Sequence, residues 1–176
     1  YSSIEHATNV GTMFRDPDNA LLPNWLHIPV GYHGRSSSII PSGIPIHRPN
    51  GQTLPNGASE PVFGPSRLVD FELEMAFITF DGKPLGDSIS TEEADSYIFG
   101  LCLFNDWSAR DIQAWEYQPL GPFQSKATAT TISPWIVTRA ALEPFRTATP
   151  PREVPLLAHL QEPGPMLYDI ALEVGE

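Results

Sequence analysis

Proline and glycine limit what this chain can fold into more than any other feature of its sequence. The 176 residues include 19 prolines and 13 glycines, and the proline share is about twice the usual value of roughly 5%. Proline lacks a backbone N–H and breaks helix interiors. The sequence therefore argues against a helical bundle. It predicts a β-rich α+β fold in which short strands and a few short helices are joined by turns.

Composition and charge are those of a globular protein. Hydrophobic residues make up 41% of the chain and charged residues 18%, unlike a disordered protein. The net charge of −11 disfavours nucleic acid and anionic membranes as partners. No apolar stretch approaches the roughly 18 residues expected of a membrane helix. The single cysteine, Cys102, is expected to be a buried thiol in a reducing compartment, the cytoplasm.

Both ends of the sequence suggest a fragment of a longer protein. The chain begins YSSIEHATNVG without an initiator methionine. Near the other end, apolar residues alternate in MLYDIALEVGE as in a strand that lacks its partner. We expect residues 1–176 to form part of one domain, in which residues 143–165, with six prolines, are a connecting segment.

Apolar runs and alternation predict the strands, and turn residues separate them. The expected strands are short pieces within residues 37–57, a clear strand at 68–80, a buried strand at 98–104 and a further strand at 129–138. Asn-Gly within the first group and Asp81-Gly82 predict hairpins. Residues 21–35 indicate an extended segment that ends in a turn.

Capping residues predict the helical segments. A short helix is expected around residues 5–15, and another begins at Ser90 or Thr91 with acidic residues in its first turn. A third is capped by Asn105 or Asp106, runs to about Tyr117 and is stopped by Pro119.

The stretch DFELEMAF, at residues 70–77, carries two acids with strand alternation. In a strand, Glu72 and Glu74 share one face and stand about 6.5–7 Å apart. One interpretation is a half-exposed strand with its acids in water. The other is a hard-cation site, because Ca²⁺ and Mg²⁺ bind converging carboxylate oxygens. The motif alone leaves both open.

The stretch NDWSARDIQAWEYQPLGPFQSK, at residues 105–126, carries a second constellation. If residues 106–117 are helical, Asp106, Arg110, Gln113 and Tyr117 fall within a sector of about 40–60°. A structural ion pair between the first two is one interpretation. The mixture of anion, cation, amide and phenol, placed where a strand meets a helix, also favours a functional site.

Several common sites lack their motifs. The histidines, His6, His27, His33, His47 and His159, are scattered. Without HxH or HExxH spacing they give little support for zinc. No GxSxG, P-loop, strand-linked GxGxxG or CxxC occurs, so serine hydrolases, nucleotide binders and redox-cofactor proteins lose most of their support.

Three segments together resemble the fumarylacetoacetase family: YSSIEHATNVGTMFR, ALLPNWLHIPVGYHGRSSSI and NDWSARDIQAWEYQPLGPFQSK, with LVDFELEMAF between them in the family's order. The resemblance runs from Tyr1 to about Leu172. It implies a metal-dependent homodimer that hydrolyses a carbon–carbon bond of a diketo-dicarboxylate, 4-fumarylacetoacetate. The products would be fumarate and acetoacetate, in the last step of tyrosine and phenylalanine breakdown. It also implies a β-rich catalytic domain, a mixed β-roll or sandwich with few short helices, truncated here.

The resemblance also implies metal ligands. The positions that match active-site Ca²⁺ ligands are Glu72, Glu74 and Asp106. The family's fourth ligand, an aspartate, precedes the position of Tyr1. Those that match positions near a second, Mg²⁺ site are Asp106, Lys126 and Thr130. A divalent cation would act as a Lewis acid toward the diketone oxygens. Ser125 and Ala129 stand where we expect glycines, so a requirement for positive φ at either would shift the loop that carries Lys126.

Catalytic and substrate-binding roles follow from the same resemblance. His6 matches the general base that takes a proton from water, and its orienting glutamate belongs to the family's C-terminal part. The positions that match substrate contacts are Tyr1, Arg15, Gln113 and Tyr117. Those that match the group stabilising developing negative charge are Arg110, Gln113 and Lys126. Arg15 would clamp a terminal carboxylate of the substrate.

Two other functions remain open at this point. One is an acylpyruvate hydrolase or decarboxylase of the same superfamily. The other is a non-catalytic, metal-stabilised scaffold or dimerisation module. Such a scaffold needs the acids but has no use for His6, which separates it from an enzyme.

Overall fold

The computed structural model describes residues 3–29, 31 and 34–175 and divides into two units. The first unit comprises Tyr1–His33, Lys83–Ser96 and Phe145–Asp169. The second comprises Gly34–Gly82, Tyr97–Pro144 and Ile170–Glu176. Each unit therefore combines segments that lie far apart in the sequence.

Helix α1 (Ile4–Phe14) is the largest element of the first unit. Ser3 caps it by accepting a hydrogen bond from the backbone N–H of His6 at 3.2 Å, and the 3-10 helix η1 (Pro17–Asn19) follows it. This confirms the helix expected around residues 5–15. Residues 21–35 were expected to be extended, but turns occupy residues 23–27, so that expectation is wrong.

Short elements complete the first unit. Helix α2 (Thr91–Ala94) has the expected N-cap at Ser90, with a reciprocal capping box to Glu93. Strand β10 (Arg146–Thr147) pairs antiparallel with β11 (Leu167–Tyr168). The alternation at the C-terminal end therefore yields a strand of two residues. The 3-10 helices here are η3 (Asp95–Tyr97), η5 (Glu143–Phe145) and η6 (Ala158–Leu160), the first two crossing the unit boundary.

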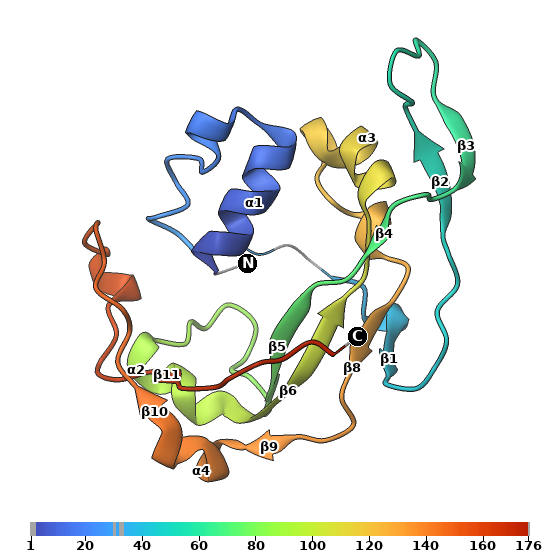
Figure 1. Cartoon of the computed structure of the whole chain (residues 1–176). Helices are drawn as coiled ribbons and strands as arrows, with labels where there is room; N and C mark the ends of the chain where they lie inside the picture. Colours follow the sequence, from blue (N-terminus) through green and yellow to red (C-terminus); the bar gives the residue numbers. More distant parts are fainter. Residues whose placement is uncertain (1–2, 30, 32–33, 176) are drawn as a thin grey trace. The chain divides into compact units, whose positions relative to one another are not determined.

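A mixed sheet is the centre of the second unit (Figure 1). Its strands are β1 (Ile39–Pro41), β8 (Thr130–Ile132), β6 (Ile98–Asp106) and β5 (Leu73–Thr79) in that order, with β9 (Val137–Thr138) also pairing β6. The β1–β8 pair is parallel and the other pairs are antiparallel. These short strands and few short helices confirm the β-rich α+β prediction.

Helix α3 (Arg110–Leu120) packs beside the β2–β3 hairpin. The hairpin strands are β2 (Asn50–Thr53) and β3 (Val62–Pro65), and Gly57, at φ +79°, lies in the loop between them. This confirms the Asn-Gly turn. At Gly51 a Cβ would lie 2.5 Å from Ile112 Cδ1, so glycine permits the close approach of strand and helix. The remaining elements are β4 (Val69–Asp70), β7 (Ser108–Ala109), α4 (Arg139–Leu142), η2 (Ser36–Ser38) and η4 (Gln124–Lys126).

Two boundaries were predicted wrongly. Helix α3 begins at Arg110, not at Asn105 or Asp106, because Asp106 still belongs to β6 and pairs with Thr130. The hairpin at Asp81-Gly82 is absent from the described chain, because residues 83–96 leave the sheet before the chain returns as β6.

The strand predictions were correct in place but not always in burial. Strand β6 was expected to be buried, yet Phe99 and Leu103 are 39% and 49% exposed while Cys102 is buried. Alternation sends these side chains to opposite faces of the sheet. The expected strand at residues 129–138 is two strands, β8 and β9. Among the helices of the described residues, none combines the length and apolarity that a membrane crossing requires.

Candidate metal centre

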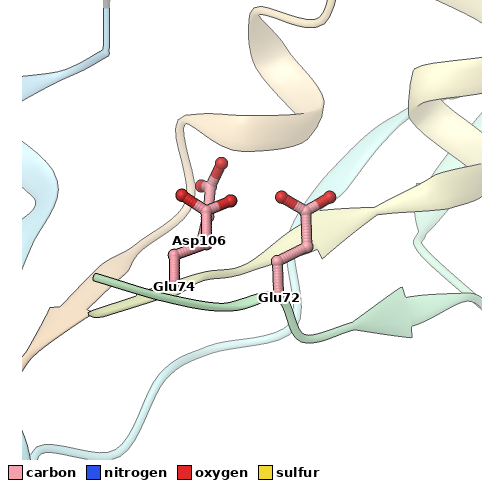
Figure 2. Close-up of side chains that lie close together, drawn as sticks. All are labelled: Glu72, Glu74 and Asp106. Atoms are coloured by element: carbon pink, nitrogen blue, oxygen red, sulfur yellow. The ribbon is translucent and has the colours of Figure 1, made fainter. Parts of the chain in front are cut away.

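Three carboxylates meet at one end of the β5–β6 pair. Glu72 directly precedes β5, Glu74 lies within it, and Asp106 is the last residue of β6. The backbone N–H of Asp106 donates to the carbonyl of Glu72 at 3.1 Å, and that of Glu72 donates to the side chain of Asn105 at 3.2 Å. Figure 2 shows the three acidic side chains on the same side of the strands. One ligand oxygen from each lies within 4.8 Å of the others.

Two cations pair with acids at this end of the sheet. The ammonium of Lys126 lies 2.6 Å from Glu72 Oε2 and 2.9 Å from Asp106 Oδ2. The guanidinium of Arg110 lies 2.8 Å from Glu72 Oε1 and 2.9 Å from Asp70 Oδ2. Glu72 is thus the acid that both cations share.

The centre of this network is buried. The side chains of Glu72, Lys126 and Asp106 are 7%, 6% and 13% exposed. Buried ions are tolerated only when charge partners and hydrogen bonds replace the water they lose. The buried polar residues of the described chain are Ser66, Glu72, Asp106, Ser108, Gln113, Ser125, Lys126 and Thr130. Glu72, Asp106 and Lys126 pair with one another, and Ser108 and Gln113 bond to the network, so most of these buried polar residues lie in or beside it.

The pKa values of Glu72 and Glu74 are shifted in opposite directions. Burial opposes ionisation of Glu72, but Lys126 and Arg110 outweigh it and hold the pKa of that carboxyl below its usual range. Burial raises the pKa of Glu74 to about 7, with hydrogen bonding and repulsion from Glu72 and repulsion from Asp106 adding to it. The negative charge of Glu74 is therefore less well stabilised than that of Glu72 by the surrounding residues.

The donor set fits a divalent cation. Among the residues that the structure describes, the four acids Glu72, Glu74, Asp106 and Asp70 lie with two paired cations, Lys126 and Arg110, so this set, fully ionised, carries two surplus negative charges. Clustered carboxylate oxygens are the ligands that Ca²⁺ and Mg²⁺ prefer. A divalent ion among them would balance the surplus and relieve the repulsion at Glu74.

Helix α3 and strand β8 bring further predicted residues to this network. Gln113 is buried, and its Oε1 accepts a hydrogen bond from Arg110 at 3.0 Å. Thr130, also buried, is the β8 partner of Asp106. Tyr117 lies two turns along α3 from Arg110 and is half-buried. Of the four residues that helical spacing grouped, Arg110, Gln113 and Tyr117 lie on α3, whereas Asp106 lies on strand β6.

The remaining predicted residues belong to the first unit. His6 is half-buried in α1. Arg15 follows that helix and donates from Nε and Nη2 to the carbonyl of Ala20 at 3.0 and 2.6 Å. Tyr1 lies outside the described residues. The roles of these three residues, like those of the other predicted site residues, stay predictions.

Sequence reasoning missed several supports of the site. Asp70 pairs with Arg110, and the hydroxyl of Ser108 lies 3.4 Å from Glu72 Oε1. These two residues are partners in the short β4–β7 ladder. Asp70 is the first residue of the stretch DFELEMAF, so its position beside the two glutamates could have indicated a role. The pairing of β4 with β7 that places Ser108 near Glu72 cannot be predicted from a sequence pattern.

Ser125 and Ala129, which stand where glycines were expected, do not adopt a positive φ. Among the described residues, no residue other than glycine has positive φ. Both side chains are buried. The loop that carries Lys126 thus accepts serine and alanine at these positions without the strain that positive φ would impose.

Sequence similarity to known proteins identifies the family of this chain. A sequence model described as the C-terminal part of fumarylacetoacetate (FAA) hydrolase matches residues 1–161. The chain belongs to the fumarylacetoacetate hydrolase family. It is similar to members of that family named fumarylacetoacetase from Bos taurus, Arabidopsis thaliana and Dictyostelium discoideum, at 56%, 57% and 58% identity.

The similarity covers this chain far more fully than it covers the relatives. Each match includes 99% of this chain, but only 42%, 41% and 42% of the respective relative. The chain therefore spans about two fifths of the length of these fumarylacetoacetate hydrolase family members.

Glu74→Gln is expected to stabilise the metal-free protein at pH 8 but hardly at pH 5. The folded-state pKa is raised from 4.5 to about 7, so the wild type loses stability as the pH rises through this interval. Glutamine is uncharged throughout. We expect a gain of about 1–2 kcal/mol at pH 8, after allowance for partial solvent exposure.

Thermal denaturation of both proteins at the two pH values measures this difference. Glu60→Gln, at an exposed position, is the matched control and should change neither midpoint. An equal shift for Glu74→Gln at pH 5 and pH 8 would contradict the electrostatic explanation.

Proposed function

We propose that this chain supplies the metal centre of a hydrolase that cleaves a carbon–carbon bond of 4-fumarylacetoacetate. The products are fumarate and acetoacetate, at the end of tyrosine and phenylalanine breakdown. The observation that carries the proposal is the buried acid–cation network, in a chain 56–58% identical to fumarylacetoacetases. The residues that resemblance assigns to metal and charge stabilisation are those that this network joins.

Glu72, Glu74 and Asp106 would hold the divalent cation, proposed as Ca²⁺. Lys126 and Thr130 would stand near a second ion, proposed as Mg²⁺. When bound, a divalent cation would supply positive charge to the oxygens of a β-diketone. The three carboxylates would hold the cation at a fixed position at one end of the β5–β6 pair.

The chemistry requires a base and a place for negative charge. Hydrolysis adds the hydroxyl of water to a carbonyl carbon, and the departing carbon keeps the electron pair of the broken bond and gains a proton. His6 is proposed to accept the proton from water. Arg110 and Lys126 are proposed to stabilise the negative charge, because buried ion pairs hold them in place. Gln113 accepts from Arg110 and orients it.

Substrate recognition and assembly complete the proposal. Tyr1, Arg15, Gln113 and Tyr117 would contact the diketo-dicarboxylate, with Arg15 paired to a carboxylate. The protein would act as a homodimer in the cytoplasm. An acylpyruvate hydrolase or decarboxylase, or an inert scaffold, gains no support, because the similar relatives carry the name fumarylacetoacetase.

His6→Ala in the complete protein is expected to lower kcat by about 10²–10⁴-fold, because water loses its proton acceptor. Binding of Ca²⁺ should change by less than about threefold, since imidazole is not the kind of ligand this ion selects. Steady-state kinetics and calorimetric Ca²⁺ titration measure the two effects. His159→Ala is the matched control, and retention of hydrolysis by His6→Ala would rule out the assignment of the base.

A further inference from the structure

We propose that Glu116 is a positioning residue for Lys126, acting through the turn that carries the lysine. The inference deepens the proposed function, on which it rests, since it concerns how the charge-stabilising ammonium is placed. Neither residue pattern nor family resemblance assigned Glu116 a role. The observation behind it is a set of hydrogen bonds from η4 to one carboxylate of α3.

The carboxylate of Glu116 accepts hydrogen bonds from the two residues that precede Lys126. Oε2 accepts from the backbone N–H of Gln124 at 2.9 Å. Oε1 accepts from the backbone N–H of Ser125 at 2.8 Å and from its hydroxyl at 2.5 Å. A charged acceptor makes such bonds stronger than a neutral one. One side chain thus fastens the start of the η4 turn to α3.

The chain path makes this contact possible. Gly121, at φ +99°, ends α3, and its N–H donates to the carbonyl of Tyr117 at 2.9 Å. Positive φ at this point needs glycine. The chain then reverses direction, so that η4 returns to the helix it has just left.

The turn leaves Lys126 little freedom. Ser125 is fully buried, with 0% exposure, and the backbone N–H of Lys126 donates to the carbonyl of Phe123 at 3.3 Å. The lysine side chain then runs inward to Glu72 and Asp106. Glu116 fixes the backbone end of this side chain, and the two site acids fix its ammonium end.

Such placement has a measurable consequence for a reaction that depends on the ammonium. Groups that stabilise a transition state must be held within about 0.5 Å of their productive position, and a displacement of about 1 Å costs on the order of 10²-fold in rate. Glu116→Gln replaces one acceptor oxygen by an NH₂ group, which faces N–H donors. We expect kcat to fall by about 10–100-fold, with KM changed by less than about threefold.

A double-mutant cycle in the complete protein tests whether Glu116 acts through the lysine. The four proteins are the wild type, Glu116→Gln, Lys126→Met and the double variant. If the lysine mediates the effect, Glu116→Gln should change kcat by less than about twofold in the Lys126→Met background. Lys126→Gln, which also lacks the cation, provides the second background if the methionine variant does not fold.

Chemical labelling gives a readout that does not depend on activity. Reductive methylation of lysines, followed by peptide mass spectrometry, reports the accessibility of each ammonium. Lys126 is 6% exposed in its side chain, whereas Lys83 is 28% exposed and pairs with Glu93. Glu116→Gln should accelerate labelling of Lys126 several-fold and leave Lys83 unchanged. Ser125→Ala, which removes one of the bonds, should have a smaller effect in the same direction and carries the test if Glu116→Gln does not fold.

Asp111→Asn is the matched control for damage to the helix. Asp111 lies on the same helix, and its carboxylate accepts from the Ser66 hydroxyl at 2.5 Å and from the backbone N–H of Arg67 at 2.7 Å. It therefore fastens a different segment, the one that follows β3, to α3. This variant should leave the labelling of Lys126 at the wild-type rate.

The outcomes separate the inference from the proposed function. A loss of kcat for Glu116→Gln that is equally large in the Lys126→Met background, or unchanged labelling of Lys126, would overturn the positioning role. Faster labelling of Lys126 together with full activity of Lys126→Met would support the positioning role. Full activity of Lys126→Met would, however, exclude Lys126 from the proposed chemistry.

Discussion

Replacing Glu72 by glutamine is expected to lower the free energy of unfolding by about 3 kcal/mol. Glu72 is 7% exposed in its side chain and pairs with both Lys126 and Arg110. Removing one partner of a buried ion pair typically costs about 3–5 kcal/mol, because the remaining charge stays desolvated. The low end applies here, since Lys126 keeps Asp106 and Arg110 keeps Asp70.

Thermal denaturation of the metal-free complete protein measures this loss. Glu60→Gln removes a charge from an exposed glutamate and should shift the midpoint by no more than a surface substitution does, about 0.5 kcal/mol. The Glu72 variant should also fail to bind Ca²⁺. If it unfolded at the wild-type midpoint, the ion-pair network would not be the structural centre of this unit.

Asp106→Asn is expected to abolish turnover while keeping the fold. Asparagine retains a side-chain oxygen for the hydrogen bond from Lys126, and Glu72 still balances the lysine charge. One of the three clustered carboxylates is lost, however. Because metal ions contribute several kcal/mol of charge stabilisation to such reactions, we expect kcat/KM to fall by at least about 10³-fold.

Steady-state kinetics and circular dichroism of the complete protein separate the two effects. Asp81→Asn, at an exposed position of the same unit, is the control and should match the wild type in both. An Asp106 variant with wild-type turnover would mean that the acid cluster is not part of the active site.

Local signals predicted most of the elements. Ser90 and Glu93 form a capping box that can be read directly from four residues, and alternation marked β5 correctly. The start of α3 was missed because Asp106 is a good capping residue by type. Its pairing with Thr130 in β8 keeps it in the sheet. Such pairing depends on residues 24 positions away, which a local pattern does not contain.

The site was predictable in its residue types but not in its connections. Alternation put Glu72 and Glu74 on one face, and resemblance added Asp106 and Lys126. Tertiary packing decides which acid pairs with which cation. Arg110 pairs with Asp70 and Glu72, whereas helical spacing had suggested a pair with Asp106. The proposed role of Glu116 depends on the reversal of the chain at Gly121, and no sequence motif predicts the contact between Glu116 and η4.

Hydrolysis of 4-fumarylacetoacetate by the complete protein, measured before and after EDTA removes divalent cations, tests whether the acid cluster serves a metal-dependent reaction. The proposed metal-dependent hydrolysis predicts equimolar release of fumarate and acetoacetate, loss of at least about 99.9% of turnover after chelation, and recovery when Ca²⁺ or Mg²⁺ is restored. Turnover that continues unchanged in EDTA would contradict it, because Glu72, Glu74 and Asp106 would then not be serving a metal-dependent reaction.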